Sequence, residues 1–466
     1  MLLSPGLILV PALLAGCPSR DVSAVDPNQS KEQQKEIPVN LNRNIDILWV
    51  VDNSGSMEQE QRSLARNFPE FARVLEGIEG GLPDIHMAVV SSDVGTPPYD
   101  STLECQGKGD DGLMQVGACP LDDGALYISD VASEDGTGRV KNYAGELADQ
   151  FSCMAQLGTE GCGFEQHLES MKLGLSNPDN GGFLRDNAFL AVIFIQDEDD
   201  CSASDGEIFN PDQDLNDRDS PLGELSSYRC FEFGTSCQPD AERTTGPRDD
   251  CTPDEDSAYI APVTDYIDFL RGLKDDPSQV IVAAITAPPE PANVEIDPDK
   301  DELWVQPACV VCDGGGADCD AATRSGADAI VAAAPAVRMN SFLEGFPSRS
   351  TFQNICTYDP AINDVDLSGG LTQIGLLLKR VVGNPCIEGK LAEPVDCRVS
   401  DVRDLDLDTQ EEFPIQSCDD SGPPCFSLVD DQTCMTESNL ALQIDRGDPP
   451  QDPPPNTTVV VRCLVN

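Results

Sequence analysis

Four apolar runs without alternating polar residues constrain the fold of this chain most strongly. They cover residues 45–51, 85–90, 189–195 and 280–285, and helical patterns of apolar residues separate them. Strands of this kind are buried on both faces, which is typical of a parallel sheet covered by helices on either side. The sequence therefore predicts an α/β fold class with a doubly wound, mainly parallel sheet.

Acidic residues stand just beyond the ends of three of these runs, at Asp52, Asp93 and Asp197. Open α/β sheets bind ligands outside the carboxyl ends of their strands. We therefore expect the three carboxylates to converge on one binding site.

The segment that begins at Asp52 reads Asp-Asn-Ser-Gly-Ser-Met and resembles the D-x-S-x-S signature of the von Willebrand factor type A (vWA) family. The resemblance includes the apolar strand before the segment and covers about residues 45–384. In that family the loop forms a metal-ion-dependent adhesion site (MIDAS), which implies Asp52, Ser54 and Ser56 as metal ligands here. It also implies Asp197, the second aspartate, although Gln196 stands where the family usually has threonine.

The resemblance implies Mg²⁺ as the cofactor, with Mn²⁺ or Ca²⁺ as alternatives. A cation of the size of Mg²⁺ takes about six oxygen ligands and keeps some of its waters. The hydroxyls of Ser54 and Ser56 can point to the same side of a tight turn, which Gly55 permits. For the threonine of the family's third loop the candidate is Thr159, which lies several residues early; alternatively Cys162 takes that position and the threonine ligand is absent.

The charge of the chain excludes one class of partner. It has 83 acidic and 29 basic residues, a formal net charge of −54. Such a chain repels nucleic acid and anionic lipid surfaces and attracts cations. We therefore expect no nucleic-acid partner.

Nineteen cysteines predict an oxidising environment with disulfides, because so many thiols are unusual in a reducing cytosol. Residues 1–16 are apolar but too short to span a bilayer. They end in Leu-Ala-Gly before Cys17, which resembles a bacterial lipobox with Cys17 as the lipidated residue. The prediction is an extracytoplasmic protein held by an N-terminal lipid anchor in the cell envelope, with the outer membrane as its place. An ordinary secretory signal with Cys17 unmodified is the alternative.

Differences in composition and residue pattern divide the chain into four parts. Residues 1–16 are predicted to be a lipoprotein signal peptide and 17–44 a flexible tether. Residues 45–384 form the vWA-like domain, with disulfide-bearing insertions near 95–150, 201–255 and 288–328. Residues 385–466 contain six cysteines and predict a small Cys-rich β unit.

The function implied is metal-dependent protein binding of the adhesion type. A partner's Glu or Asp carboxylate would complete the coordination of the metal. A disulfide-stapled envelope scaffold, with a site that is unused or purely structural, is the alternative. A metal-dependent hydrolase that uses residues 197–200 is less favoured, because the chain contains none of the common hydrolase motifs. We therefore expect a binding protein and not an enzyme.

Overall fold

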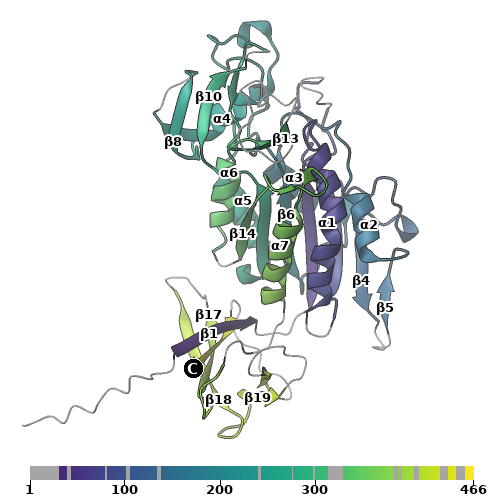
Figure 1. Ribbon diagram of the computed structural model, residues 1–466, viewed down its shortest axis with the longest axis vertical. Helices are drawn as coiled ribbons and strands as arrows, with labels where there is room; N and C mark the ends of the chain where they lie inside the picture. The colour runs from purple at the N-terminus through teal and green to yellow at the C-terminus, as the bar shows by residue number, and fades with distance from the viewer. Residues whose placement is uncertain are drawn as a thin grey trace, which may run out of the picture.

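The structure of the 466-residue chain is a computed structural model (Figure 1). It describes residues 31–38, 43–78, 81–100, 105, 107–133, 138–239, 243–274, 276–297, 300–312, 329–347, 349–382, 387, 390–403, 409–430, 439–447 and 457–465. The predicted signal peptide and the predicted lipidation of Cys17 lie outside these residues.

A seven-stranded sheet forms the centre of the largest unit, in the order β14-β9-β6-β2-β3-β4-β5. The five strands from β14 to β3 run parallel, and β4 and β5 are antiparallel. The four apolar runs of the sequence lie in β2, β3, β6 and β9. The bounds are β2 (Asn44–Val51), β3 (Asp84–Ser91), β4 (Ile128–Ala132), β5 (Arg139–Lys141), β6 (Phe189–Ile195), β9 (Val280–Thr286) and β14 (Ser350–Asn354).

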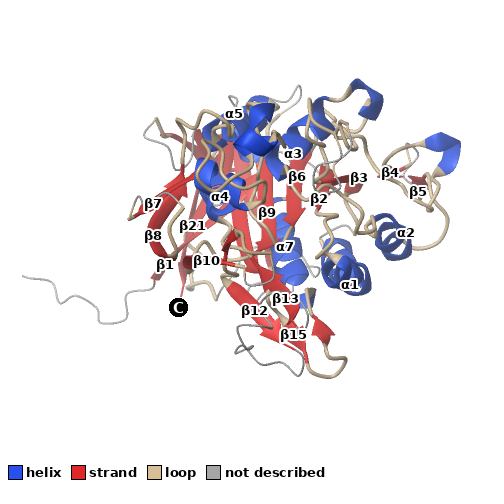
Figure 2. Cartoon of the chain, turned by 90° about the horizontal axis from the view of Figure 1, so that it is seen from above, coloured by secondary structure: helices blue, strands red, loops and turns tan. Residues whose placement is uncertain are grey.

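Helices cover both faces of this sheet (Figure 2). Trp49 of β2 packs on Phe68, Phe71 and Phe151 of the helices on one face, whereas its neighbour Leu48 faces the opposite layer. The four runs are therefore apolar at nearly every position, and the buried Asp46 and His86 are paired with Arg185 and with the Phe183 carbonyl. One layer contains α1 (Glu58–Glu76), α2 (Leu147–Met154) and α7 (Ser368–Val381), and the other contains α3 (His167–Ser176), α5 (Val263–Gly272) and α6 (Val337–Glu344).

Two insertions that are far apart in the sequence build one antiparallel sheet, in the order β11-β10-β8-β7. It lies with α4 beyond the carboxyl ends of the parallel strands (Figure 1). The bounds are α4 (Tyr228–Gly234), β7 (Thr235–Gln238), β8 (Gly246–Pro253), β10 (Ala292–Ile296) and β11 (Leu303–Val305). Two short hairpins lie nearby in the sequence, β12 (Cys309–Cys312) with β13 (Ala329–Ala333) and β15 (Tyr358–Asp359) with β16 (Asp364–Val365).

A six-stranded sheet near the C-terminus lies on the opposite side of the main unit from the insertion sheet (Figure 1). Its order is β1-β21-β17-β18-β19-β20, and only the β18–β19 pair is parallel among its described strands. Residues 31–38, within the stretch predicted to be a tether, form its edge strand β1. The bounds are β1 (Lys31–Pro38), β17 (Cys397–Arg403), β18 (Glu411–Ser417), β19 (Cys425–Asp430), β20 (Leu440–Asp445) and β21 (Thr457–Val465).

The predicted fold class, a doubly wound and mainly parallel sheet with a small β unit, is wrong for this chain. The structure is mixed α/β: the central sheet is itself mixed, and four further sheets are antiparallel or mixed. The three predicted insertions contain hairpins. Strands joined by short loops pair antiparallel, because a parallel pair needs a long crossover.

Seven disulfides join described cysteines, which confirms that the chain is rich in disulfides. They fit an oxidising, extracytoplasmic environment. The pairs are Cys105–Cys162, Cys119–Cys153, Cys201–Cys230, Cys237–Cys251, Cys309–Cys356, Cys397–Cys463 and Cys418–Cys425. Within the described part of the chain, no helix combines the length and apolar character needed to span a bilayer.

Candidate functional site

The loop from Asp52 to Met57 joins the carboxyl end of β2 to α1, and the Asp52 side chain stabilises its turn. Asp52 Oδ1 accepts a hydrogen bond from the Ser54 backbone N–H at 2.8 Å. The Met57 N–H then donates to the Ser54 carbonyl at 3.2 Å, which closes a tight turn around Gly55. The hydroxyl oxygens of Ser54 and Ser56 lie 3.1 Å apart. The two hydroxyls therefore lie on the same side of the turn, as the sequence predicts.

Asp52 is fully buried, and both of its carboxylate oxygens have partners. Oδ2 lies 3.0 Å from Nε2 of His167, and Oδ1 accepts from the Ser92 hydroxyl at 3.3 Å. Burial by itself would lower the pKa of His167. The hydrogen bond to Asp52 and the nearby carboxylate charges outweigh burial, so the pKa of His167 is raised. Asp52 therefore holds the loop in place and is itself hydrogen-bonded to the His167 ring.

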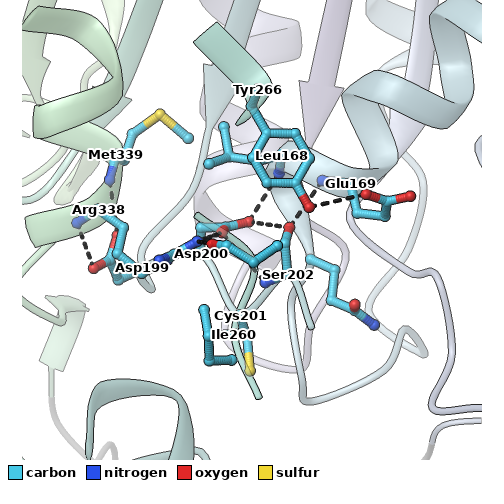
Figure 3. Close-up of polar contacts among 12 residues, drawn as sticks. Leu168, Glu169, Asp199, Asp200, Cys201, Ser202, Ile260, Tyr266, Arg338 and Met339 are labelled. Carbon is cyan, nitrogen blue, oxygen red and sulfur yellow. Dashed lines mark hydrogen bonds and ion pairs between the residues drawn. The ribbon is translucent and has the colours of Figure 1, made fainter. Parts of the chain in front are cut away.

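The four acidic residues from Asp197 to Asp200 follow β6 and have different partners, and Figure 3 shows Asp199 and Asp200. Asp199 accepts the backbone N–H groups of Arg338 and Met339 at 2.8 and 3.1 Å, and so caps the first turn of α6. Asp200 accepts the Leu168 N–H at 2.8 Å and pairs with the Arg338 guanidinium at 3.0 Å. These two carboxylates are thus used by the fold.

Asp197 has a different environment. Its side chain is 2% exposed, and its Oδ1 has no hydrogen-bond partner among the described residues. Burial, with the charges of Glu198, Asp52 and Glu60, raises the pKa of Asp197 well above its usual range, although the Ser56 hydroxyl donates to it. Asp197 is therefore the member of this acidic run that faces the loop of Ser56.

Glu165 and Glu198 form a hydrogen-bonded carboxyl pair beside this loop. Burial raises the pKa of both groups, and the charge of Asp52 raises each further. The charge of Glu198 also contributes to the raised pKa of Glu165, which lies well above its usual range. The nearby positive groups His167 and Lys300 partly offset the rise in pKa at Glu198.

Thr159 lies half-exposed in a segment that is bound to the Asp52 loop. The Gly161 N–H donates to the Asn53 carbonyl at 2.9 Å, and the Gln61 amide exchanges hydrogen bonds with Gly158. The Thr159 hydroxyl itself makes no hydrogen bond to described residues of the site. Cys162 is paired with Cys105 and is therefore not available as a thiolate ligand.

The structure brings together Asp52, Ser54, Ser56 and Asp197, but it does not turn Asp93 toward them. Asp93 Oδ1 accepts the Gly95 N–H at 2.9 Å instead, and the preceding Ser92 contacts Asp52. Sequence reasoning missed four buried polar residues of the site, Glu60, Ser92, Glu165 and His167. The polar run at residues 165–167 before a helix was the signal for two of them.

The residues of the loop fit a divalent cation. In the described part of the chain, no three His, Cys, Asp or Glu side chains are grouped so that they alone could hold a metal ion. A metal here therefore needs the serine hydroxyls. Ser54 and Ser56 offer two oxygens on one side of the turn, and Asp197 offers a buried oxygen without a partner. Such oxygens are the ligands of Mg²⁺, Mn²⁺ and Ca²⁺.

Glu60 on α1 gives the metal-free site a measurable pH dependence. Its side chain is 1% exposed, and burial, followed by the charges of Asp52 and Asp364, raises its pKa to about 8. A carboxyl whose pKa is raised on folding stabilises the fold at low pH and loses this contribution as pH rises through the folded pKa. With a chelator present, raising the pH from 7 to 8 should lower the free energy of unfolding by about 1 kcal/mol through Glu60 alone.

The variants Glu60→Gln and Glu58→Gln test this assignment by urea unfolding at both pH values. Glu58 lies on the exposed side of the same turn of α1, next to Arg62. In Glu60→Gln, the part of the fall in unfolding free energy between pH 7 and 8 that Glu60 contributes should be absent. In Glu58→Gln it should remain. Equal pH dependence in the two variants would contradict a raised pKa at Glu60.

No protein-family model and no curated protein matches this chain. Among solved structures, the chain is similar to the pilus adhesin SpaC from Lactobacillus rhamnosus GG, with a TM-score of 0.31 and 12% identity over 94% of this chain and 44% of that one. It is also similar to the pilus adhesin RrgA from Streptococcus pneumoniae, with a TM-score of 0.27 and 11% identity over 93% of this chain and 58% of that one. The chain thus spans about half the length of these proteins. Likenesses with such low TM-scores carry no argument about fold or function.

Proposed function

We propose that the chain is an extracytoplasmic binding protein in which the loop from Asp52 to Met57 acts as a metal-ion-dependent adhesion site of the vWA kind. Ser54, Ser56 and Asp197 would hold a divalent cation, with Mg²⁺ as the first candidate. The observation that carries the proposal is the Asp197 carboxylate oxygen, which is buried beside Ser56 without a partner. An unpaired buried carboxylate is costly, and a cation removes that cost.

The residues around the loop have separate tasks in this proposal. Asp52 fixes the turn through the Ser54 N–H, and His167 and Ser92 fix Asp52 in turn. The bound cation supplies an open coordination position for a carboxylate of the partner. A chain with a net charge of −54 repels an acidic partner, so binding of a Glu or Asp side chain depends on the positive charge of the ion.

Thr159 is a further candidate ligand, since its segment is hydrogen-bonded to the Asp52 loop. The action proposed is binding without catalysis. A lipid anchor on Cys17, and display at the outer membrane, remain predictions from the sequence.

Thermal unfolding of the full chain with its disulfides formed tests the proposal. A single site at a hundredfold excess of metal over the dissociation constant should stabilise the native state by about 2.7 kcal/mol. We expect Mg²⁺, added after chelation, to raise the unfolding midpoint of the parent.

The matched control is the double variant Ser54→Ala with Ser56→Ala, which keeps every acidic residue of the chain. It should respond much less to the metal than the parent. If both proteins respond alike, the ions only screen the acidic surface, and the adhesion-site proposal is wrong.

A disulfide-stapled envelope scaffold is the second candidate function. One observation favours it: both Asp52 oxygens already have protein partners, so the loop keeps its shape without a metal. The seven disulfides among the described residues provide stability by a route that needs no metal. Partner binding that persists in the presence of a chelator would favour this function.

A further inference from the structure

A cavity of about 330 Å³ opens beside Ser56, between the carboxyl end of the central sheet and the insertion sheet. Glu165, Glu198 and Asp199 line it from the central unit. Helix α4 and the β10–β11 hairpin, which belong to two different insertions, supply the opposite wall. The cavity thus exists only because these insertions fold against the loops after β6 and α2.

The lining of the cavity combines negative charge with aromatic surface. Asp297 and Glu302 of the hairpin add to the carboxylates of the central unit. Lys300 is the one basic side chain among the described lining residues, and it lies 3.6 Å from Glu302. Ion pairing therefore leaves the wall with an excess of negative charge.

Three aromatic residues lie on the insertion side of the cavity: Tyr228 and Phe231 of α4 and Trp304 of β11. Aromatic rings beside carboxylates form a favourable environment for a cation, because the ring faces and the carboxylates both attract positive charge. A planar guanidinium can also stack on such rings.

An unpaired hydroxyl provides independent support for a ligand. Ser226, just before α4, is 7% exposed and lines the cavity, and its Oγ has no hydrogen-bond partner among the described residues. Buried polar groups in native proteins are normally paired. The Ser226 hydroxyl can accept a hydrogen bond from an N–H donor that enters the cavity.

We propose that this cavity is a subsite for an arginine or lysine side chain of a protein partner. The carboxylates of Asp297 and Glu302 attract the cation, the rings of Tyr228, Phe231 and Trp304 pack against it, and Ser226 accepts one of its N–H groups. The partner then offers a basic residue to the cavity and, by the proposed function, an acidic residue to the metal. The basic subsite itself does not need the metal.

The two tryptophans of the chain make a direct test possible. Trp49 is fully buried in the central core, and Trp304 lines the cavity. In the full chain labelled with 5-fluorotryptophan, ¹⁹F NMR should show one signal for each residue, and Trp304→Phe assigns them. Titration with N-acetyl-arginine amide should shift only the Trp304 signal and should saturate. The uncharged isostere N-acetyl-citrulline amide should cause no saturable shift.

Three single variants distinguish this cavity from the general acidity of the chain. Glu302→Gln should weaken binding of the arginine amide about tenfold, because a charge-assisted contact is lost and Lys300 is left unpaired. Ser226→Ala should weaken it several-fold. Asp249→Asn removes the same charge from an exposed position on β8 of the insertion sheet, away from the lining, and should change little.

Saturable binding of the citrulline amide with equal affinity would overturn the proposal, and so would equal losses in Glu302→Gln and Asp249→Asn. The titration is repeated with a chelator and in the variant Ser54→Ala with Ser56→Ala. If the arginine amide still binds with the chelator and in the double variant, the subsite is supported even if the metal proposal fails. If binding is lost under these conditions, the subsite depends on the Asp52 loop, and the proposal as stated is overturned.

Discussion

Replacing Arg338 by methionine is expected to lower the free energy of unfolding by about 3–5 kcal/mol, because the change leaves a buried carboxylate without its counter-ion. Arg338 is 1% exposed and Asp200 is also 1% exposed. The guanidinium lies 3.0 Å from the Asp200 carboxylate (Figure 3). It also donates to the Ala261 carbonyl at 2.8 Å. This ion pair joins α6 to the acidic run after β6.

Urea unfolding with a chelator present measures this effect, and two further variants make it specific. The double variant Arg338→Met with Asp200→Asn removes both charges and should recover much of the loss, since neutral groups are cheaper to bury. Arg62→Met removes an exposed arginine paired with Glu58 and Asp364, and should cost about 1 kcal/mol or less. If Arg338→Met costs no more than Arg62→Met, the pair does not hold this part of the fold together.

Removal of the Cys105–Cys162 disulfide by a double alanine substitution is expected to lower the free energy of unfolding by about 4 kcal/mol on the loop-entropy scale for its sequence separation of 57 residues. The change should also affect the site. Cys162 follows Gly161, whose N–H donates to the Asn53 carbonyl, and a Cβ at Gly161 would lie 2.3 Å from the Asn53 amide oxygen, so the two segments pack closely. We therefore expect the stabilisation by Mg²⁺ to fall as well.

The control for this prediction is removal of Cys418–Cys425 in the C-terminal sheet. Its sequence separation is 7 residues, so the expected loss is about 2 kcal/mol. Thermal unfolding with and without Mg²⁺ should give a reduced metal response for the first pair and an unchanged response for the second. An equal metal response in both variants would show that the Cys105–Cys162 disulfide does not affect the proposed metal site.

Local sequence patterns were sufficient to locate the parts of the molecule with strong local signals. Residues 45–51 and 189–195 lie in β2 and β6, because a strand covered on both faces is almost entirely apolar; Asp46 is the one polar residue of these two runs, and it pairs with Arg185. The turn from Asp52 to Ser56 follows from the local hydrogen bond between Asp52 and the Ser54 N–H, whereas the placement of Asp52 depends on His167 and Ser92. The high cysteine content also predicted the disulfides, because cysteine-rich chains are typical of oxidising environments.

The acidic run from Asp197 to Asp200 marks the limit of such reasoning. Four adjacent carboxylates are equivalent in sequence, yet α6 uses Asp199, Arg338 uses Asp200, and Asp197 is left beside Ser56. The polar run at residues 165–167 did not reveal the roles of His167 and Glu165, because these roles come from Asp52 and Glu198 in the folded chain. Charge and polarity can be read from a residue, but its partner cannot.

The sequence by itself determined where the buried strands lie, how the Asp52 loop turns, and that the cysteines pair. Only the tertiary structure decided that two separate insertions share one antiparallel sheet, β8 pairing with β10, and that a cavity forms between this sheet and the loop of Ser56. Periodicity and turn chemistry act over a few residues, so sequence reveals them. Strand pairing across insertions and the burial of a particular carboxylate depend on which distant surfaces meet, and that is settled only when the whole chain packs.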